Sequence, residues 1–558
     1  MEDVKKIENT VEKLKQNGEQ EEIKRIKEEL KEMLEEEIHS EVHNEIHEDK
    51  KKIIDEGYQI LAAKKGISLS NEIPIREKNK IMMQYFEWYL PNDGKLWENL
   101  ANDSDHLTSI GVAAVWIPPC YKAISQEDVG YGVYDLYDLG EFDQKGTVRT
   151  KYGDKIQLLH TVKTLHSKDI KVYADVVLNH RGGADETERF KVVQVDPENR
   201  NHEISEPYEI EGWTKFTFPG RNGKYSEFQW SFVHFTACDF DHRTGEKGIF
   251  KILGENKSFS DSVDTEKGNY DYLMHSDIDY RNTDVIDETI KWGKWFAKEL
   301  DIDGMRFDAI KHIDGDFIRV FLREIRLASG KSLYAVGEYW NADETILKSY
   351  IQDSADSLAL FDVRLHYNFF EAANTGADFD MRTIFDNTLL SESPLNVVTF
   401  VDNHDSQPGQ SLESWVADWF KPLAYALILL RKDGYPCLFY GDYYGAGGEN
   451  PVMPKKEILD PLLKARLDYS YGDQVDYFDD PNCIAWIRKG DPFYNNSGLA
   501  VIMSNGVASQ KLMSFGPDKA KTKWSDITGN ILGEVVLDEN GNGLFTCNGG
   551  SVSVYHQV

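Results

Sequence analysis

The chain has 558 residues, of which 96 are acidic and 63 basic, so its formal net charge is -33 at pH 7. At roughly 150 residues per domain, this length allows three or four domains, each with a full hydrophobic core. The negative charge repels phosphate backbones and anionic lipid surfaces, which argues against nucleic acid and membranes as partners. The longest strongly apolar run, near residues 423–430, is far shorter than the roughly 20 residues that a membrane-spanning helix needs.

The first residues and the cysteines indicate the compartment. The N-terminal stretch is charged throughout and lacks the apolar segment and small-residue cleavage site of a secretory signal. The five cysteines are scattered and form no CxxC pair, a pattern typical of reduced thiols that predicts neither a disulfide nor a zinc site. We therefore expect a cytoplasmic protein.

Residues 1–78 are predicted to form a charged helical extension. Apolar residues between Ile7 and Ile53 keep helical spacing, with a helix stop at Gln16-Asn17-Gly18, which indicates a helical hairpin or one long helix. The apolar stripe is too narrow for a core of its own, so it should be covered by a second copy of the chain or by the body of the protein. Of these two alternatives, self-association into a homo-oligomer is slightly favoured.

Three histidines lie on one face of this predicted helix. His39, His43 and His47 are spaced at i, i+4 and i+8, beside two glutamates. This spacing allows a metal site, but a solvated helix face is the favoured interpretation.

From about residue 79 short strand patterns alternate with helical ones, such as the helical patterns at 151–168 and 283–300. Eight such strands predict a parallel (β/α)8 barrel, a TIM barrel, of the α/β class. The predicted strands are 81–86, 112–118, 171–178, 302–307, 332–337, 357–362, 396–401 and 436–440.

Two further units follow from the spacing of the strands. The gap between the third and fourth strands is too long for one crossover helix, so residues 181–281 are predicted to form an inserted B domain, which divides the barrel into 79–180 and 282–471. From residue 472 to 558, short strands separated by Asn-Gly turns predict a C-terminal antiparallel β domain, a β-sandwich.

Acidic residues follow several predicted barrel strands, at the end where barrel enzymes carry their reactive groups. Asp308, Glu338 and Asp405 would repel one another unless they share a proton or a developing positive charge. Glycosidic cleavage supplies that charge, because its transition state resembles an oxocarbenium ion.

The residue types suggest a role for each acid. Arg306, two residues before Asp308 on the same strand, should keep Asp308 ionised, which suits a carboxylate close below the anomeric carbon. Crowding and burial should raise the pKa of Glu338, which suits a general acid. Asp405 would remain a charged partner for sugar hydroxyls, to which His180 and His404 add donors.

The segments around these residues resemble a known family. Asp175-Val-Val-Leu-Asn179-His180 and the segments ending in Asp308, Glu338 and Asp405 resemble, in order and spacing, the four signature regions of glycoside hydrolase family thirteen, the alpha-amylase family. Longer stretches resemble its bacterial liquefying type, namely 84–88, 114–119, 128–140, 268–274 and 419–425. The resemblance covers about residues 80–558 and does not reach the first 75 or so.

The resemblance implies a retaining endo-hydrolase of alpha-1,4-glucans, such as starch, glycogen and maltooligosaccharides. It assigns the nucleophile to Asp308, the general acid/base to Glu338 and transition-state stabilisation to Asp405. Tyr131 would stack against the sugar at the cleaved bond, while Lys311, His312 and Trp340 would line the leaving-group side. For Tyr131 and Trp340, core packing is the alternative.

The resemblance also implies calcium at the junction of inserted domain and barrel. The ligands would be Asn179, Asp271, Asp277 and the backbone carbonyl of His312, which are hard oxygen donors of the kind that Ca²⁺ prefers. Thr236, Ser260 and Arg281 stand where secreted relatives carry aspartates that hold a second calcium and a sodium. Asn482 and Asn505 similarly replace calcium-binding aspartates in the terminal domain. We therefore predict one Ca²⁺ per chain.

Two alternatives to a general alpha-amylase remain at this point. Within the enzyme class, the chain could be a maltohexaose-forming amylase or a transglycosylase, which differ in their products. Outside it, the chain could be an inactive glucan-binding scaffold, although the presence of all three carboxylates and Arg306 counts against this.

Overall fold

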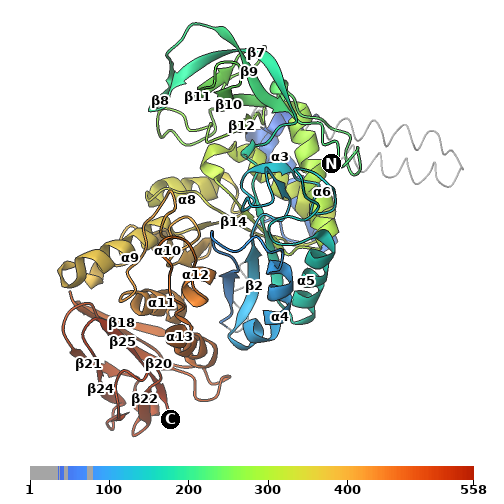
Figure 1. Ribbon diagram of the computed structural model, residues 1–558. Coiled ribbons are helices and arrows are strands. Elements are labelled where there is room, and N and C mark those ends of the chain that lie inside the picture. The colour runs from blue at the N-terminus through green and yellow to red at the C-terminus, as the bar shows by residue number, and fades with distance from the viewer. Residues whose placement is uncertain (1–35, 37, 43–47, 72–78) are drawn as a thin grey trace, which may run out of the picture.

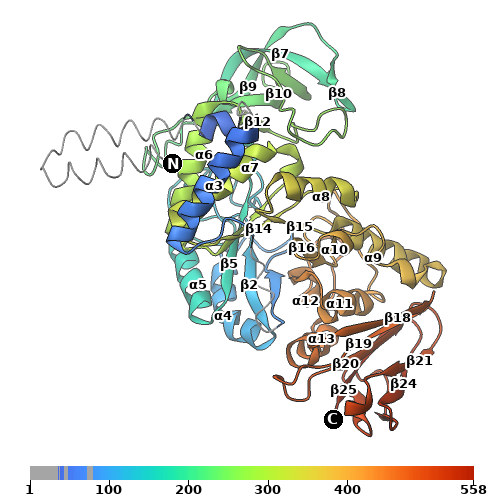
Figure 2. The same ribbon diagram turned by 180° about the vertical axis from the view of Figure 1, so that it is seen from behind.

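The computed structural model describes residues 36, 38–42, 48–71 and 79–558 (Figures 1 and 2). Eight parallel strands form the central barrel: β1 (Ile81–Gln84), β2 (Val112–Ile117), β5 (Lys171–Val176), β13 (Gly304–Phe307), β14 (Tyr334–Gly337), β15 (Ala359–Phe361), β16 (Val397–Phe400) and β17 (Tyr435–Phe439). The barrel closes in the order β1-β17-β16-β15-β14-β13-β5-β2. Each of the eight strands overlaps a predicted segment, so the predicted (β/α)8 fold is confirmed.

Helices surround the barrel and explain why its strands are apolar on both faces. The longer ones are α4 (Leu96–Ser109), α5 (Lys155–Ser167), α6 (Thr283–Leu300), α7 (Gly315–Ser329), α8 (Glu344–Asp353), α9 (Val363–Thr375), α11 (Lys421–Leu430) and α13 (Lys456–Tyr469). Shorter turns of helix are α10 (Leu389–Glu392), α12 (Tyr440–Tyr443), η3 (Ile310–His312), η4 (Gly376–Asp378) and η5 (Met381–Thr383).

Side-chain caps fix where the helices nearest the site begin. Asp154 and Gln157 form a capping box at the start of α5, and Asn282 accepts a hydrogen bond from the backbone of α6. Asp314 accepts hydrogen bonds from the backbone N–H groups of Asp316 and Phe317, which starts α7 directly after η3.

The insertion lies between β5 and β13 and forms a sheet at one end of the molecule (Figure 1). Its strands are β6 (His180–Arg181), β7 (Glu186–Asp196), β8 (Asn199–Glu203), β9 (Tyr208–Lys215), β10 (Phe235–Asp241), β11 (Glu246–Ile252) and β12 (Ser276–Ile278), with the short helix η2 (Phe232–His234) before β10. The small pair β3 (Lys122–Ala123) and β4 (Val133–Asp135) lies after β2. Because β6 begins at His180, this sheet starts one residue after Asn179.

The C-terminal strands are antiparallel, as predicted, and lie at the opposite end from the insertion (Figure 1). One sheet has the order β18-β19-β20-β25-β22-β23 and a second pairs β21 with β24. Their bounds are β18 (Gln474–Asp480), β19 (Cys483–Arg488), β20 (Leu499–Ser504), β21 (Ser509–Ser514), β22 (Lys523–Asp526), β23 (Glu534–Val536), β24 (Asn542–Cys547) and β25 (Ser551–Gln557), with η6 (Pro517–Lys519) between the two sheets' strands. The five cysteines of the chain are buried and free.

The described part of the N-terminal extension docks on the barrel. Helix α3 (Glu48–Lys65) lies along α6 and α7 in Figure 2. Ile38 and Val42 belong to the same buried cluster as the barrel core, and Ile67 and Leu69 pack against Leu327 of α7. The described residues of the apolar stripe, Ile38 and Val42, are therefore covered by the barrel of the same chain, which supports docking and not the favoured homo-oligomer. The predicted helix stop at 16–18 and the stripe before residue 36 lie outside the described residues.

Polar contacts reinforce this docked position. Arg323 of α7 forms a 2.6 Å ion pair with the buried Glu41, and its guanidinium lies 3.7 Å from the ring centroid of Tyr58. His39 Nε2 lies 2.9 Å from Asp287 Oδ1 on α6. His43 and His47 lie outside the described residues. No helix in the described part of the chain is long and apolar enough to cross a membrane.

Candidate active site

One buried arginine organises the mouth of the barrel. Arg306 is fully buried on β13, and its Nη1 lies 2.8 Å from Asp308 Oδ1 and 2.9 Å from Asp175 Oδ1. Its Nη2 lies 2.8 Å from Glu338 Oε2. A guanidinium can hold several carboxylates in a fixed geometry because its donors lie in one rigid plane. Arg306 therefore joins two of the three predicted acids and adds a third carboxylate, Asp175.

The strand register brings Asp308 and Glu338 together. Each follows the last residue of its strand, and these last residues, Phe307 and Gly337, are direct partners in the sheet. A Cβ atom at Gly337 would lie 2.2 Å from Ile310 Cδ1, so the Ile310 side chain of η3 can pack against the end of β14 in this position because residue 337 is glycine.

Ala309, the residue between Asp308 and η3, also contacts a predicted catalytic group. Ala309 has a φ of 50°, a left-handed conformation that is unusual for a residue with a Cβ atom. In this conformation its backbone N–H donates to Glu338 Oε2 at 3.0 Å. The local backbone strain thus coincides with the position of a predicted catalytic group.

Burial raises the pKa of Glu338 to about 8; nearby Asp308 and Asp405 raise it further, while Arg306 opposes the shift. Burial also raises the pKa of Asp405 to about 7, against the opposing effect of Arg306. A carboxyl whose pKa lies near 8 keeps its proton at neutral pH. The site therefore holds one protonated acid beside Asp308, whose carboxylate is paired with a permanent cation.

Asp405 lies after β16 and contacts a neutral histidine. Gln84 Nε2 donates to His404 Nδ1 at 2.9 Å, so the proton of His404 is on Nε2, which lies 3.2 Å from Asp405 Oδ2. Burial, aided by Arg306, holds the pKa of His404 well below its usual value. The pair presents one N–H donor and one carboxylate side by side.

An aromatic stack forms one wall of the site. The rings of Tyr131, Trp88 and His404 are nearly parallel, and their centroids lie 5.9 Å (Tyr131–Trp88), 5.1 Å (Tyr131–His404) and 6.1 Å (Trp88–His404) apart. The Tyr131 hydroxyl donates to Asp175 Oδ2 at 2.9 Å, and His180 Nε2 donates to the Tyr131 carbonyl at 2.8 Å. His180 and His404 therefore both contact Tyr131.

The other predicted substrate-binding residues, Lys311, His312 and Trp340, follow Asp308 and Glu338 closely in the sequence. Lys311 Nζ donates to the Trp340 carbonyl at 3.1 Å and forms a 2.8 Å ion pair with Glu266. Trp340 is partly exposed and donates through Nε1 to Tyr367 at 3.0 Å. His312 is buried, and its Nδ1 lies 2.5 Å from the carbonyl oxygen of Tyr270. His312 therefore contacts the inserted segment, whereas Lys311 is hydrogen-bonded to Trp340.

Sequence reasoning assigned no role to Asp175 and did not single out Gln84 or Trp88. Asp175 is fully buried and also accepts a hydrogen bond from Trp116 Nε1 at 3.0 Å. Burial raises its pKa to about 6, while Arg306 opposes the rise. The available signal was its position inside an apolar strand, since a buried carboxylate requires a partner.

The predicted calcium ligands form a second acidic group. Asp271 and Asp277 are both buried, and Asp271 Oδ2 has no hydrogen-bond partner. Burial raises the pKa of Asp271 to about 8 and raises that of Asp277 well above its usual value, with Asp271 as the next cause. Asn179 Nδ2 lies 3.3 Å from Asp277 Oδ1.

This donor set fits a hard cation. Two adjacent buried carboxyls, one of them with an orphaned oxygen, gain a charge partner and a ligand position if Ca²⁺ binds between them. The described residues contain no cluster of three or more His, Cys, Asp or Glu side chains suited to a metal, so amide and carbonyl oxygens must complete the coordination.

Thr236, Ser260 and Arg281, which the resemblance predicts to replace aspartates, are engaged with neighbouring groups. The Thr236 hydroxyl donates to Asp277, and Ser260 Oγ donates to Asp314 Oδ2 at 3.0 Å. Arg281 donates to the side chain and carbonyl of Ser258, and its Nε lies 3.3 Å from Asp279 Oδ1. A guanidinium beside Asp279 is incompatible with a further cation at that carboxylate.

The corresponding positions of the terminal domain form an amide contact. Asn482 Nδ2 donates to Asn505 Oδ1 at 3.0 Å, and Asn505 Nδ2 donates to the Gly376 carbonyl at 2.8 Å. These contacts join the terminal domain to the barrel through neutral groups.

Comparison with known sequences decides the family. Residues 97–474 match the family model described as "Alpha amylase, catalytic domain", which is more than half of the chain. The chain belongs to the alpha-amylase family.

Several members of this family are similar along most of their length. The "Glucan 1,4-alpha-maltohexaosidase" of Bacillus sp. (strain 707) is 51% identical over 479 residues, which cover 86% of this chain and 92% of the relative. The "Alpha-amylase" of Bacillus licheniformis is also 51% identical, covering 86% and 94%. The "Cytoplasmic alpha-amylase" of Escherichia coli (strain K12) is 45% identical, covering 86% and 99%.

Solved structures support the fold. The crystal structure of the alpha-amylase from Geobacillus thermoleovorans, complexed with acarbose, has a TM-score of 0.58 at 19% identity and covers 86% of this chain and 98% of its own. At this identity the likeness concerns the fold alone.

Proposed function

We propose that this glycoside hydrolase cleaves internal alpha-1,4-glucosidic bonds of starch, glycogen and maltooligosaccharides with retention of anomeric configuration. The observation that carries the proposal is the pair of hydrogen-bonded contacts from one guanidinium, Arg306, to Asp308 and to Glu338. Retention requires two carboxyl groups close enough for one to attack the anomeric carbon while the other protonates the leaving oxygen. Because the carboxyl groups of Asp308 and Glu338 both contact one guanidinium, a short separation between them is supported.

In the first step the Asp308 carboxylate attacks the anomeric carbon and the glycosidic C–O bond breaks. The bonding pair goes to the leaving oxygen, which takes the proton of Glu338. In the second step Glu338, now a carboxylate, takes a proton from water, whose oxygen attacks the same carbon and releases Asp308. Both carboxyls return to their starting states.

The surrounding residues bind and orient the sugar. Asp405 and the Nε2–H of His404 present an acceptor and a donor to ring hydroxyls, and Tyr131 offers a flat face beside them. Trp340 and Lys311, joined by a hydrogen bond, support a leaving-group side near Glu338. Asp175 acts through Arg306 and Tyr131, so we assign it a positioning role.

We propose that one Ca²⁺ binds Asn179, Asp271, Asp277 and the carbonyl oxygen of His312. When bound, the ion supplies charge neutralisation and coordination at the junction of insertion and barrel. Because His312 directly follows Lys311, this junction also positions the predicted leaving-group side. The uncompensated carboxyls of Asp271 and Asp277 support the proposal.

The product length distinguishes this proposal from the maltohexaose-forming alternative, which the relative from strain 707 keeps open. The relative from Escherichia coli is named cytoplasmic, and we propose the same compartment for this chain. The arrangement of the three carboxylates and Arg306 disfavours an inactive scaffold.

Digestion of maltoheptaose, followed by chromatography over time, tests the proposed activity. We expect products of several lengths from the first minutes, and their loss in Asp308→Asn. A product mixture dominated by maltohexaose from a polymer substrate would favour the alternative enzyme. An Asp308→Asn variant as active as the parent would contradict the proposed nucleophile.

A further inference from the structure

A second buried cation contacts the segment that carries Asp405. Lys421, the first residue of α11, is fully buried. Its Nζ donates to Asp402 Oδ2 and to Asp442 Oδ2, the latter at 2.9 Å. The ammonium lies 3.4 Å from the ring centroid of Trp415. Lys421 therefore joins the chain just after β16, where Asp402 lies, to α12, which contains Asp442.

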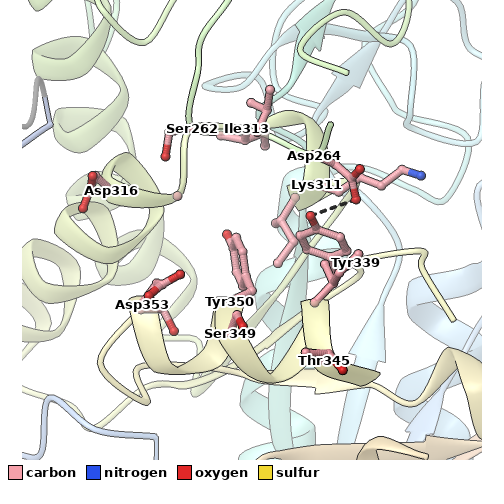
Figure 3. Close-up of a pocket in the computed structure, with 15 residues that line it drawn as sticks. Ser262, Asp264, Lys311, Ile313, Asp316, Tyr339, Thr345, Ser349, Tyr350 and Asp353 are labelled. Atoms are coloured by element: carbon pink, nitrogen blue, oxygen red, sulfur yellow. Dashed lines mark hydrogen bonds between the residues drawn. The ribbon is translucent and has the colours of Figure 1, made fainter. Parts of the chain in front are cut away.

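The two carboxylates that Lys421 binds have no access to solvent. Asp402 and Asp442 are buried, so their charges require a partner inside the protein. An exposed acid has no such requirement: Asp353, for example, lines an open cavity of about 500 Å³ between η3, α7 and α8 (Figure 3). Removing one partner of a buried ion pair is costly, because the other charge is left uncompensated. Lys421 therefore holds Asp402 in place.

Asp402 is in turn bonded to the turn that presents Asp405. Ser406 Oγ donates to Asp402 Oδ1 at 2.6 Å and accepts a hydrogen bond from the backbone N–H of Asn403 at 3.0 Å. Asn403 Oδ1 accepts hydrogen bonds from the backbone N–H groups of Asp405 and Ser406, both at 2.9 Å. The backbone N–H of Val416 donates to Asp402 Oδ2 at 3.1 Å. A continuous chain of contacts thus runs from the buried ammonium to the backbone of Asp405.

This chain of contacts bears on the chemistry of the mouth. We propose that Lys421 and Ser406 are positioning residues, which act through Asp402 to hold Asp405 and His404 where they meet the sugar. The inference rests on the proposed function, since it concerns the same reaction. Hydrogen bonds to sugar hydroxyls that strengthen in the transition state act on kcat more than on KM. A displacement of about 1 Å at such a group can lower the rate by about 10²-fold.

Two buried hydroxyls, one at each carboxylate that Lys421 binds, provide matched variants. Ser406→Ala removes the hydroxyl between Asp402 and the turn. Tyr425→Phe removes the hydroxyl that donates to Asp442 Oδ2 at 2.7 Å, on the side away from the turn. Both side chains are fully buried, so each variant loses one hydroxyl of the same kind. Replacing Lys421 itself would leave two buried carboxylates uncompensated and would threaten the fold.

The test measures maltopentaose kinetics and urea unfolding of both variants. We expect Ser406→Ala to lower kcat about fivefold or more and to keep KM within about twofold of the parent. Tyr425→Phe should keep both constants within about twofold, although its urea midpoint should fall by a similar amount. A merely structural role would move the two midpoints and leave kcat unchanged in both variants.

Hydrogen exchange followed by mass spectrometry gives a second readout, which does not depend on activity. The peptide that spans residues 402–416 should exchange about threefold faster or more in Ser406→Ala than in the parent, because the turn opens more often. In Tyr425→Phe the same peptide should exchange at the parental rate.

Parental kcat or parental exchange in Ser406→Ala would overturn the positioning role. An equal fall of kcat in Tyr425→Phe would also overturn it, because the loss would then follow stability and not the turn. Absence of maltopentaose hydrolysis by the unsubstituted chain would instead refute the proposed activity, and the exchange measurement would still decide whether Ser406 holds the turn.

Discussion

The molecule contains two buried acidic clusters that differ in their source of positive charge. At the barrel mouth, Asp308, Glu338 and Asp175 surround Arg306, a cation that belongs to the chain. At the junction with the insertion, Asp271 and Asp277 are buried together and one Asp271 oxygen has no hydrogen-bond partner, while Arg281, whose charge lowers the pKa of Asp271, is paired with Asp279.

The two clusters meet the same physical requirement, compensation of buried carboxylates, in different ways. Buried carboxylates are costly unless a charge partner or a proton compensates them. The mouth has a fixed counterion, which leaves one proton to be used in chemistry. At the junction Arg281 is shared with Asp279, so further compensation must come from protons or from a bound cation, and the stability of the junction should depend on the medium.

Removing the proton donor at the mouth should have the largest effect. Glu338→Gln keeps the shape of the side chain but cannot protonate the leaving oxygen, so kcat for maltopentaose should fall by about 10²- to 10⁴-fold. The exposed Glu371→Gln on α9 is the matched control and should stay within threefold of the parent. A fall of less than tenfold in Glu338→Gln would mean that another group supplies the proton.

Removing the internal counterion should have the next largest effect. Arg306→Met leaves the carboxyls of Asp175, Asp308 and Glu338 buried without their cation, which should cost about 3–5 kcal/mol of unfolding free energy. Urea unfolding, followed by fluorescence, measures this cost. Stability equal to the parent would show that the guanidinium is not the compensating charge.

Removing the proposed Ca²⁺, a counterion that comes from the solution, should affect only the junction of insertion and barrel. We expect one tightly held Ca²⁺ per chain after dialysis, and its removal by a chelator should lower the free energy of unfolding by about 2.7 kcal/mol if the free ion stands at 100 times its Kd. Asp271→Asn should bind less calcium and respond less to the chelator. Two or more tightly held ions per chain would contradict the single site.

The pH dependence of the activity should follow the ionisation of Glu338 at the barrel mouth. Because the pKa of Glu338 is raised to about 8, the acid is protonated below that pH and loses its proton above it. We therefore expect kcat/KM for maltopentaose to be retained toward neutral pH and to fall about tenfold per pH unit above pH 8. If kcat/KM instead began to fall as the pH rose above about 5, Glu338 would be ionised in the working enzyme.

Much of the fold and of the mouth could be predicted from the sequence. Eight apolar strands at barrel spacing identify the fold, and the positions directly after β13 and β14 place Asp308 and Glu338 at one end, because parallel strands share a direction. The family resemblance adds the roles of Tyr131 and Trp340, which no spacing rule supplies.

Other features depend on contacts that a single sequence does not reveal. The apolar stripe of residues 38–42 predicts burial but not what covers it, and the covering surface is the cluster around α7. Asp175 is one acid in an apolar strand, and only the register with Arg306 on β13 shows its partner.

The most direct test of the mouth as a retaining site is proton NMR of the sugar released in the first minutes of maltopentaose hydrolysis. Attack by Asp308 followed by attack of water inverts the anomeric carbon twice, so the account predicts that the alpha anomer appears first and mutarotates later. Initial release of the beta anomer would mean that water attacks directly, and would contradict Asp308 as the nucleophile beside Glu338.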